Sequence, residues 1–251
     1  YREVFAPQFI DRVVHHFVVQ YISEEVEKRL IQDCYSCRVG KGTLYGIERA
    51  KYHMRSVTEN YAKDAYILKL DVSGYFMNMN THILRNQIDD LQLIQNLECS
   101  PFEKDILSYL IDIIIFTSPI NHCKTVGDKS LWHFIPKNKS LFHSPKYSGL
   151  PIGNYTSQIF GNIYLNEFDH WVKNELGIKH YGRYVDDMYF MHNDRSFLKQ
   201  CVPVIKKKMK SYGMEIHPKK IYFQHYTKGI HFLGRFIKPY RSYVSSRTKN
   251  N

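Results

Sequence analysis

Apolar residues near the start of the chain recur with the spacing of one helix face. Positions three and four residues apart share a face of an α-helix, and the segment from about 8 to 31 follows that rule. Its apolar positions are Ile10, Val13, Val14, Phe17, Tyr21 and Ile22. We therefore expect an amphipathic helix here, then a basic loop punctuated by glycine, CRVGKGT, and a second helix over about 43–60.

The middle of the chain predicts one strand and two further helices. AYILKLDV is a short β-type run that ends at Asp71. SPFEKDILSYLIDIIIF begins with Ser-Pro, has an acidic first turn and continues with a helical apolar period. SQIFGNIYLNEFDHWVKNEL places its apolar residues on one helical stripe, which indicates a core helix. The polar residues 118–148 between these helices predict a long loop or an irregular hairpin.

The last third of the chain predicts a hairpin, a helix and a second hairpin. HYGRYVDDMYFM sets two β-type runs on either side of Asp186 and Asp187. DRSFLKQCVPVIKKKMKSYG runs from an Asp cap to a Gly stop, and Pro203 inside it predicts a kinked or two-part helix. IYFQHYTKGIHFLGRFIK predicts a hairpin across Lys228 and Gly229. Because helices and strands mix without a regular βαβ order, the expected fold class is α+β with an antiparallel sheet.

Composition adds a partner class to this picture. The 251 residues suffice for one or two domains, and 35 Lys and Arg against 24 Asp and Glu give a formal charge of +11. The 20 Tyr and 15 Phe are interleaved with the basic residues. Phosphates attract Lys and Arg while bases stack on aromatic rings, so the mixture favours nucleic acid over a membrane surface. By charge alone, a soluble basic protein without such a partner is equally consistent.

Cysteine usage and hydropathy indicate the compartment. The five Cys are odd in number and unevenly spaced, which favours a reducing compartment, and the cytoplasm is the default. The lone CxxC of Cys34 and Cys37 lacks a second pair at zinc-ribbon spacing and predicts two ordinary thiols. The strongest apolar run, YLIDIIIF, is short and broken by Asp112, so no membrane partner is expected.

Three carboxylates carry the candidate chemistry. Asp71 ends one expected strand, and Asp186 and Asp187 lie at the turn of a hairpin. If these strands are neighbours, the carboxylates meet at one rim, where their repulsion requires a divalent cation. Two Mg²⁺ ions roughly 4 Å apart would fit and would support phosphoryl transfer. An Asp pair also occurs at turns without any metal, because Asp bonds to the turn backbone. The pair alone leaves both interpretations open.

Five motifs in order resemble those of reverse transcriptases. They are LKLDVSGYF (68–76), GLPIGNYTSQ (149–158), YVDD (184–187), SYGMEIHPKK (211–220) and FLGRF (232–236). The resemblance covers nearly the whole chain. It implies a right-hand polymerase with helical fingers, an antiparallel-sheet palm and a thumb that is mostly absent. It also implies an RNA-directed DNA polymerase, a nucleotidyltransferase that uses two Mg²⁺ ions, dNTPs, an RNA template and a DNA or RNA primer.

The resemblance assigns the catalytic roles. The implied metal ligands are Asp71, Asp186, Asp187 and the carbonyl of Val72. Of these, Asp186 is the more direct second carboxylate and Asp187 contributes mainly charge. Lys219 or Lys220 is expected to donate a proton to the departing pyrophosphate or to offset its charge, and the sequence does not choose between them.

The resemblance also assigns substrate contacts. The residues expected at the nucleotide or template are Arg2, Arg38, Lys41, Tyr75, Phe76, Ile152, Gly153 and Gln158. Phe76 falls where the family keeps a bulky side chain against the sugar 2′ position, which implies a DNA product; an ordinary core Phe is the alternative. Gly153 is expected to let the backbone come close to the substrate. The expected primer grip is Phe232, Leu233 and Gly234, with Gly234 allowing its tight turn.

A departure within the second motif refines the resemblance. Ile152 and Gln158 stand where most reverse transcriptases carry Gln and Pro. Together with FAPQFIDRVVHH, CRVGKGTLYGI and the KSLF at 139–142, this pattern resembles the enzymes of diversity-generating retroelements. That implies a bacterial or phage-encoded enzyme of mutagenic retrohoming, error-prone at template adenines and helped by a small basic pentameric accessory protein. A Gln at position 152 could hydrogen-bond the nucleotide sugar and penalise a misaligned pair, whereas Ile cannot.

The implied domain order is fingers 1–64, palm 65–90, fingers with an insertion loop 91–148, palm 149–238 and the start of a thumb at 239–251. The nearest alternative is a reverse transcriptase of another bacterial lineage, such as a retron, a group II intron or a phage-defence enzyme. A non-catalytic RNA-binding scaffold on the polymerase fold and a metal-dependent nuclease using the same carboxylates are further alternatives.

Overall fold

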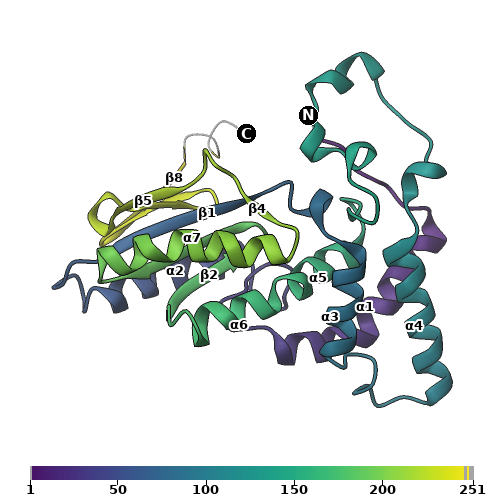
Figure 1. The fold of residues 1–251 in the computed structure, drawn as a ribbon, viewed down its shortest axis with the longest axis horizontal. Coiled ribbons are helices and arrows are strands. Elements are labelled where there is room, and N and C mark those ends of the chain that lie inside the picture. The colour runs from purple at the N-terminus through teal and green to yellow at the C-terminus, as the bar shows by residue number, and fades with distance from the viewer. Residues whose placement is uncertain (1, 246–247, 249–251) are drawn as a thin grey trace. The chain divides into compact units, whose positions relative to one another are not determined.

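The computed structural model describes residues 2–245 and 248, which form two compact units. The helical unit contains residues 2–30, 74–165 and 212–214, and the sheet unit contains 31–73, 166–211 and the described residues from 215 onward. Figure 1 shows the elements of both along the chain. Residues 246–247 and 249–251 of the expected thumb segment lie outside the described residues.

The helical unit is built from four helices and several short 3₁₀ turns. The helices are α1 (Phe9–Arg29), α3 (Thr81–Asp90), α4 (Pro101–Phe116) and α5 (Tyr155–Tyr164). Helix α4 begins where the sequence predicts, with Ser100 and Glu103 forming a reciprocal capping box. Helix α3 was not predicted; Asn80 caps it by accepting from the backbone N–H groups of His82 and Ile83.

Helix α1 forms as predicted but buries a different face. Ile22 is buried, whereas Ile10, Val13 and Phe17 are exposed. The buried residues of α1 are His15, Val18, Val19, Ile22, Glu25 and Val26. This helix is apolar on more than one side, so spacing alone could not select the face that packs. His15 contributes a polar contact, with Nδ1 lying 2.9 Å from the hydroxyl of Thr156 on α5.

Between α4 and α5 the polar segment has no hairpin in the described structure. It folds as a series of single 3₁₀ turns: Pro119–Asn121, Lys129–Phe134, Lys137–Lys139 and Leu141–His143. The sequence prediction of a long loop is confirmed, and its alternative, an irregular hairpin, is wrong. Isolated 3₁₀ turns suit a stretch rich in Pro, Asn and Lys because each turn needs few residues and no partner strand.

The sheet unit holds a five-stranded antiparallel sheet. Strands β2, β3, β1 and β4 follow one another in that order, and β5 also pairs with β1. Their bounds are β1 (Tyr66–Ser73), β2 (His180–Tyr184), β3 (Asp187–His192), β4 (Glu215–Ile216) and β5 (Tyr222–His225). The antiparallel sheet expected from the sequence is thus confirmed. Its two central strands, β1 and β3, are those that carry the acidic motifs.

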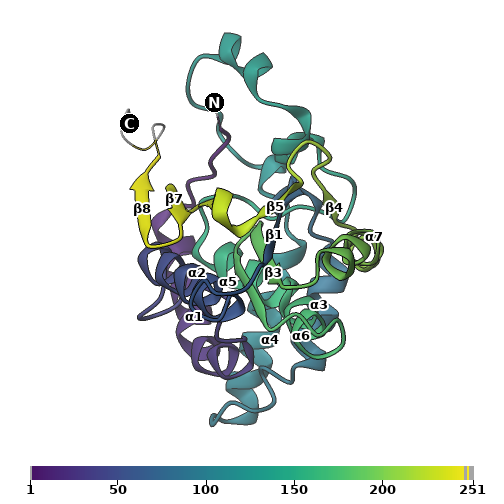
Figure 2. The same ribbon diagram turned by 90° about the vertical axis from the view of Figure 1, so that its left-hand side faces the viewer.

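Three helices accompany this sheet: α2 (Thr43–Val57), α6 (Asn166–Asn174) and α7 (Arg195–Ser211). Figure 2 shows α2 and α7 on opposite faces of the strands. Alternate residues of a strand point to opposite faces, so β1 and β3 are buried on both sides and are apolar along most of their length. Helix α7 continues through Pro203, whose position is exposed.

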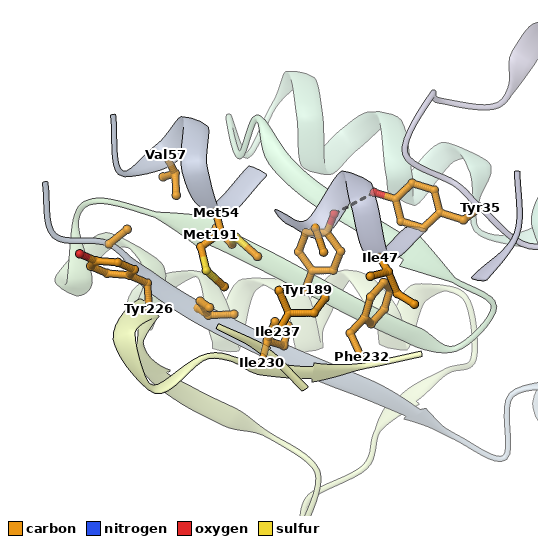
Figure 3. Close-up of a cluster of buried hydrophobic side chains, with 13 residues drawn as sticks. Tyr35, Ile47, Met54, Val57, Tyr189, Met191, Tyr226, Ile230, Phe232 and Ile237 are labelled. Carbon is orange, nitrogen blue, oxygen red and sulfur yellow. Dashed lines mark hydrogen bonds between the residues drawn. The ribbon is translucent and has the colours of Figure 1, made fainter. Parts of the chain in front are cut away.

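One apolar cluster fills the space between α2 and the strands (Figure 3). Tyr189 and Met191 of β3 meet Met54 of α2, and Tyr35 donates or accepts a hydroxyl hydrogen bond of 2.8 Å with Tyr189. The cluster also contains Phe232, which is fully buried. This core fixes the strands that carry the acidic motifs.

The predicted hairpin across Lys228 and Gly229 is wrong. Strand β5 pairs with β1, and the next hairpin is formed by β6 (Ile230–Phe232) and β7 (Arg235–Lys238), with β8 (Arg241–Val244) added to make a three-stranded sheet. The segment IYFQHYTKGIHFLGRFIK is apolar on both sides of Lys228–Gly229, which suggested a hairpin there. The two-residue turn of the hairpin lies instead at Leu233–Gly234.

The predicted single stripe from Phe160 to Leu176 is interrupted. Helix α5 ends at Tyr164 and α6 begins at Asn166, with Leu165 between them. Phe160, Ile163, Tyr164, Phe168 and Val172 are buried, so the assignment of the stripe to the core is confirmed for them. No helix in the described part of the chain is long and apolar enough to cross a membrane.

Candidate active site

The acidic residues meet at one end of the β1–β3 pair. Asp71 of β1 lies directly opposite Asp187 of β3 in the antiparallel register. Val185 and Asp186 form the two-residue turn that joins β2 to β3, directly before Asp187. The Asp186 carbonyl accepts a 3.2 Å hydrogen bond from the Val72 N–H. The strands expected from sequence to be neighbours are therefore paired, and they bring all three carboxylates to one rim.

Two lysines balance these carboxylates. Lys220 Nζ lies 2.8 Å from both carboxylate oxygens of Asp71, and Lys69 Nζ lies 3.0 Å from Oδ2 of Asp187. Among the described residues, no three Asp, Glu, His or Cys side chains are gathered into a ready metal site. Lys220 and Lys69 supply positive charge to two of the three carboxylates.

Asp187 has an electrostatically costly position. Burial raises the pKa of Asp187 to about 6, and the negative charges of Asp186 and Asp71 act in the same direction while Lys69 opposes them. Its Oδ1 is buried and has no hydrogen-bond partner among the described residues. An orphaned carboxylate oxygen beside two other acidic residues favours a site that gains stability when a cation arrives.

The geometry chooses between the two candidate lysines. Residues 217–220 form a turn in which the Lys220 N–H donates to the His217 carbonyl, and this turn directs Lys220 to Asp71. Lys219 is exposed, and its backbone N–H donates to His217 Nδ1. Lys220 is therefore the lysine brought to the carboxylates.

In the helical unit, Tyr75 and Phe76 lie beside helix α5. Tyr75 is buried and its hydroxyl donates a 2.5 Å hydrogen bond to the Gly161 carbonyl, so its side chain is a packing element. Phe76 is half-buried at the start of a 3₁₀ turn, Phe76–Asn78. A Cβ added at Gly161 would lie 3.3 Å from the Phe76 ring, so this glycine gives the ring its space.

The loop that carries Ile152 is held by the N-terminal segment of the same unit. The Phe5 N–H donates a 2.7 Å hydrogen bond to the Ile152 carbonyl. A Cβ at Gly153, where φ is +125°, would collide with the Phe5 carbonyl oxygen. The close approach that Gly153 allows here is by the chain's own backbone, whereas the sequence predicted an approach to substrate.

The remaining predicted contacts differ in setting. Arg2 and Gln158 are exposed in the helical unit. In the sheet unit, Arg38 donates to the carbonyls of Ile31 and Cys34, and Lys41 donates to the Gln32 carbonyl. Arg38 and Lys41 thus brace their own loop.

The expected primer grip forms a tight hairpin. Phe232 pairs with Arg235, and the two turn residues have positive φ, +49° at Leu233 and +76° at Gly234. That geometry suits a two-residue hairpin, so the tight turn predicted at Gly234 is present. Phe232 is buried in the core, so its side chain supports the turn from within.

Comparison with known proteins decides the family. The sequence model of the family described as reverse transcriptase (RNA-dependent DNA polymerase) matches residues 1–237. The chain belongs to the reverse transcriptase family. No curated protein matches the sequence.

Solved structures share the reverse transcriptase fold. Apo telomerase from Candida tropicalis truncated from its C-terminal domain superposes with a TM-score of 0.62 at 14% identity, over 92% of this chain and 45% of that one. Telomerase from Candida albicans in complex with a fragment of telomeric RNA gives 0.55 at 16% identity, over 94% and 37%. At these identities the likeness shows the fold alone. The chain spans less than half the length of either structure.

Two residues of this reverse transcriptase site escaped sequence reasoning. Lys69 precedes Asp71 by two positions, so both side chains point to one face of β1; that period was a usable signal. Arg183 is fully buried two residues before the acidic turn. A charged residue inside an aromatic strand required a buried partner, and that requirement was the signal.

Proposed function

We propose that this reverse transcriptase is an RNA-directed DNA polymerase whose active site is formed by Asp71, Asp186 and Asp187. The observation that carries the proposal is the register of β1 and β3, which sets Asp71 opposite Asp187 beside the Asp186 turn. On this assignment residues 65–90 and 149–238 act as palm, 1–64 and 91–148 as fingers, and 239–251 as the start of a thumb.

The residues present suit a divalent cation. Carboxylate oxygens are the ligands that Mg²⁺ prefers, and the buried Oδ1 of Asp187 lacks any partner among the described residues. Asp71, Asp186, Asp187 and the Val72 carbonyl would hold two ions. Bound there, Mg²⁺ would lower the pKa of the primer hydroxyl and neutralise charge on the leaving pyrophosphate.

Lys220 is the proton donor in this proposal. Its ammonium lies 2.8 Å from both carboxylate oxygens of Asp71 and offsets their charge. If a bound cation offsets the charge of Asp71 instead, the Lys220 ammonium is available to donate a proton to the departing pyrophosphate. Phe76, half-buried beside Gly161, would exclude a 2′-hydroxyl and so select dNTPs.

The test is extension of a DNA primer on an RNA template with Mg²⁺ and dNTPs. Wild-type protein should extend the primer, and Asp186→Ala should abolish extension. Asp105→Ala, which removes an exposed carboxylate from α4, is the matched control and should extend normally. Cleaved strands in place of extended primers would indicate a nuclease. Tight RNA binding without any product would indicate a scaffold.

We further propose that the enzyme serves a diversity-generating retroelement, as a cytoplasmic, bacterial or phage-encoded protein with an RNA template and a basic pentameric accessory partner. The segments that carry this resemblance touch within the helical unit. The Phe5 N–H donates to the Ile152 carbonyl, and Glu3, just before the FAPQFIDRVVHH segment, accepts from the Ser140 hydroxyl at 2.7 Å and the Leu141 N–H at 2.8 Å. An RNA partner is also consistent with the telomeric RNA bound by the Candida telomerases.

Position 152 tests the retroelement assignment. Ile152→Gln should raise fidelity opposite template adenine, because Gln can hydrogen-bond the nucleotide sugar and penalise a misaligned pair. Sequencing of cDNA made by the wild type and the variant, with and without candidate accessory proteins, measures the error spectrum. Equal error rates opposite adenine would reject this role of Ile152 and favour a reverse transcriptase of another bacterial lineage.

A further inference from the structure

A buried ion pair lies directly behind the acidic turn. Arg183 of β2 and Asp169 of α6 both have fully buried side chains. Arg183 Nη2 lies 2.6 Å from Asp169 Oδ2, and Nε lies 2.8 Å from Oδ1. The Tyr181 hydroxyl adds a third donor to this carboxylate at 2.6 Å. Asp169 is thus neutralised and bonded within the protein core, so this pair is built to persist.

Arg183 also reaches the turn itself. Its Nη1 donates a 3.1 Å hydrogen bond to the carbonyl of Val185, the first turn residue. Val185 has φ +57°, a conformation that a β-branched residue rarely adopts. Such a backbone persists only where surrounding contacts hold it. The contact from Arg183 is one of those that hold it.

The backbone around this contact is fixed on both sides. Arg183 N–H donates to the Asp33 carbonyl at 2.9 Å, and Tyr35 N–H donates to the Arg183 carbonyl at 3.0 Å. On the other side of the turn, Val72 N–H donates to the Asp186 carbonyl. The backbone that carries the Arg183 guanidinium is therefore held by hydrogen bonds on both sides, and the guanidinium reaches the Val185–Asp186 turn through the Val185 carbonyl.

We propose that Arg183 and Asp169 are positioning residues that hold the Asp186 carboxylate where it can bind metal. This inference rests on the proposed function of the three carboxylates. The charge of Arg183 is offset by Asp169, so the pair acts on the turn through geometry. Lysine cannot replace Arg183, because a single ammonium lacks the planar guanidinium that bonds to Asp169 and to Val185 at the same time.

The experiment compares three variants with the full chain as background. Arg183→Lys keeps the charge pair but loses the fork. Arg183→Met combined with Asp169→Leu removes both charges together, which a core of matched volume tolerates better than a lone charge. Tyr181→Phe removes a donor to Asp169 and leaves the link to Val185, so it is the matched control. Glu167→Gln breaks an exposed ion pair of α6 with Lys208 and controls for the helix.

Three properties are measured for each variant. The first is Mn²⁺ binding without nucleic acid, monitored by electron paramagnetic resonance; the others are thermal unfolding and the kcat and KM for dNTP. Arg183→Lys and the double variant should weaken Mn²⁺ binding about tenfold. Their kcat should fall about 10- to 100-fold with KM nearly unchanged. Tyr181→Phe and Glu167→Gln should bind Mn²⁺ as the wild type does, even if Tyr181→Phe melts earlier.

Each outcome decides the proposal. Wild-type Mn²⁺ binding and kcat in either folded Arg183 variant would overturn it, as would equal Mn²⁺ weakening in Tyr181→Phe. If Arg183→Lys does not fold, the double variant decides. Failure of the proposed active site looks different, because Asp186→Ala would then retain primer extension and Mn²⁺ binding.

Discussion

Two hairpins of the sheet unit have the same length of turn and different means of holding it. The Asp186 hairpin joins β2 to β3 through Val185 and Asp186, and the Gly234 hairpin joins β6 to β7 through Leu233 and Gly234. Gly234 adopts its φ of +76° at little cost, whereas Val185 is forced to +57°. The Gly234 turn has a permissive residue at one of its two positive-φ positions, whereas the Asp186 turn places Val185 at its positive-φ position and is contacted by Arg183 and Val72.

The difference between the two turns shows which contacts fix the position of a functional side chain. A turn that only reverses the chain can rely on a permissive residue. A turn that must present a carboxylate within a fraction of an ångström gains more from distant residues that over-determine it. Substitutions in the two hairpins should therefore have opposite signatures, with loss of chemistry in one and loss of stability in the other.

The largest expected effect is on chemistry in the Asp186 hairpin. Asp186→Asn should lower kcat for primer extension by about a thousandfold, since it removes a charged group at the reacting centre. Asp187→Asn should cost less, about 10- to 100-fold, because we expect that residue to contribute mainly charge. Single-turnover extension with saturating dNTP measures both. Equal losses would contradict the ranking of the two carboxylates.

Next comes the lysine that contacts Asp71, the residue paired with Asp187 of the hairpin. Lys220→Met should lower kcat about 100-fold, because general acid catalysis and charge offset are lost together. Lys219→Met, the exposed neighbour, should stay within about threefold and serves as the matched control. Pyrophosphate release in a pre-steady-state assay is the measurement. The assignment fails if the two variants behave alike.

The comparison of the turns is tested by replacing the glycine of one turn and introducing a glycine into the other. Gly234→Ala should lower the free energy of unfolding by about 1–2 kcal/mol, because alanine is strained at positive φ. Val185→Gly should change it by about 0.5 kcal/mol or less, since relief of strain is offset by the flexibility of glycine in the unfolded chain. Urea denaturation measures both. A loss in Val185→Gly as large as in Gly234→Ala would show that the turns are held alike.

A change of pH concerns the Asp186 hairpin through His180, which begins β2. Burial lowers the pKa of His180 to about 4, and the charges of His53 and Lys173 add to this. An unfolded histidine binds its proton near pH 6.5, so acid favours the unfolded state between these values. Stability should fall by about 1–2 kcal/mol as pH drops from about 6.5 to 4.

His180→Gln should flatten that slope, because Gln does not titrate. Gln can still reach the Ser56 hydroxyl that His180 contacts at 3.1 Å, so the local contact is kept. His231→Gln, in the exposed position of β6, is the matched variant from the Gly234 hairpin and should change the slope less. Urea denaturation at several pH values compares them. Parallel slopes for wild type and His180→Gln would remove this role from His180.

The fold and the carboxylates were predictable from sequence for a physical reason. Strands buried on both faces are recognised in the sequence as apolar runs. An acidic residue at the end of such a run is expected at the rim of the sheet. Asp71 and Asp186 were therefore expected at one rim if their strands were neighbours, and the resemblance to reverse transcriptases favoured that arrangement. The choice of Lys220 over Lys219 was not predictable, because it depends on the turn at 217–220.

Where sequence reasoning failed, competing local signals were nearly equal. Helix α1 has more than one apolar side, and packing against its neighbours α4 and α5 selected the face with Val18 and Val19. The strand β5 was assigned to the wrong partner because pairing with β1 is a long-range choice that turn signals cannot encode. The charge of Arg183 inside an aromatic strand signalled a buried partner, but the sequence could not show that this partner is Asp169 on another element, α6.

The contact of Phe5 with Ile152 gives the amino-terminal segment a practical meaning. A purification tag or a deletion that disturbs residues 3–5 is at the same time an alteration of the loop that carries Ile152. Variants of this enzyme that differ at that end should accordingly be compared for copying fidelity before they are treated as interchangeable reagents.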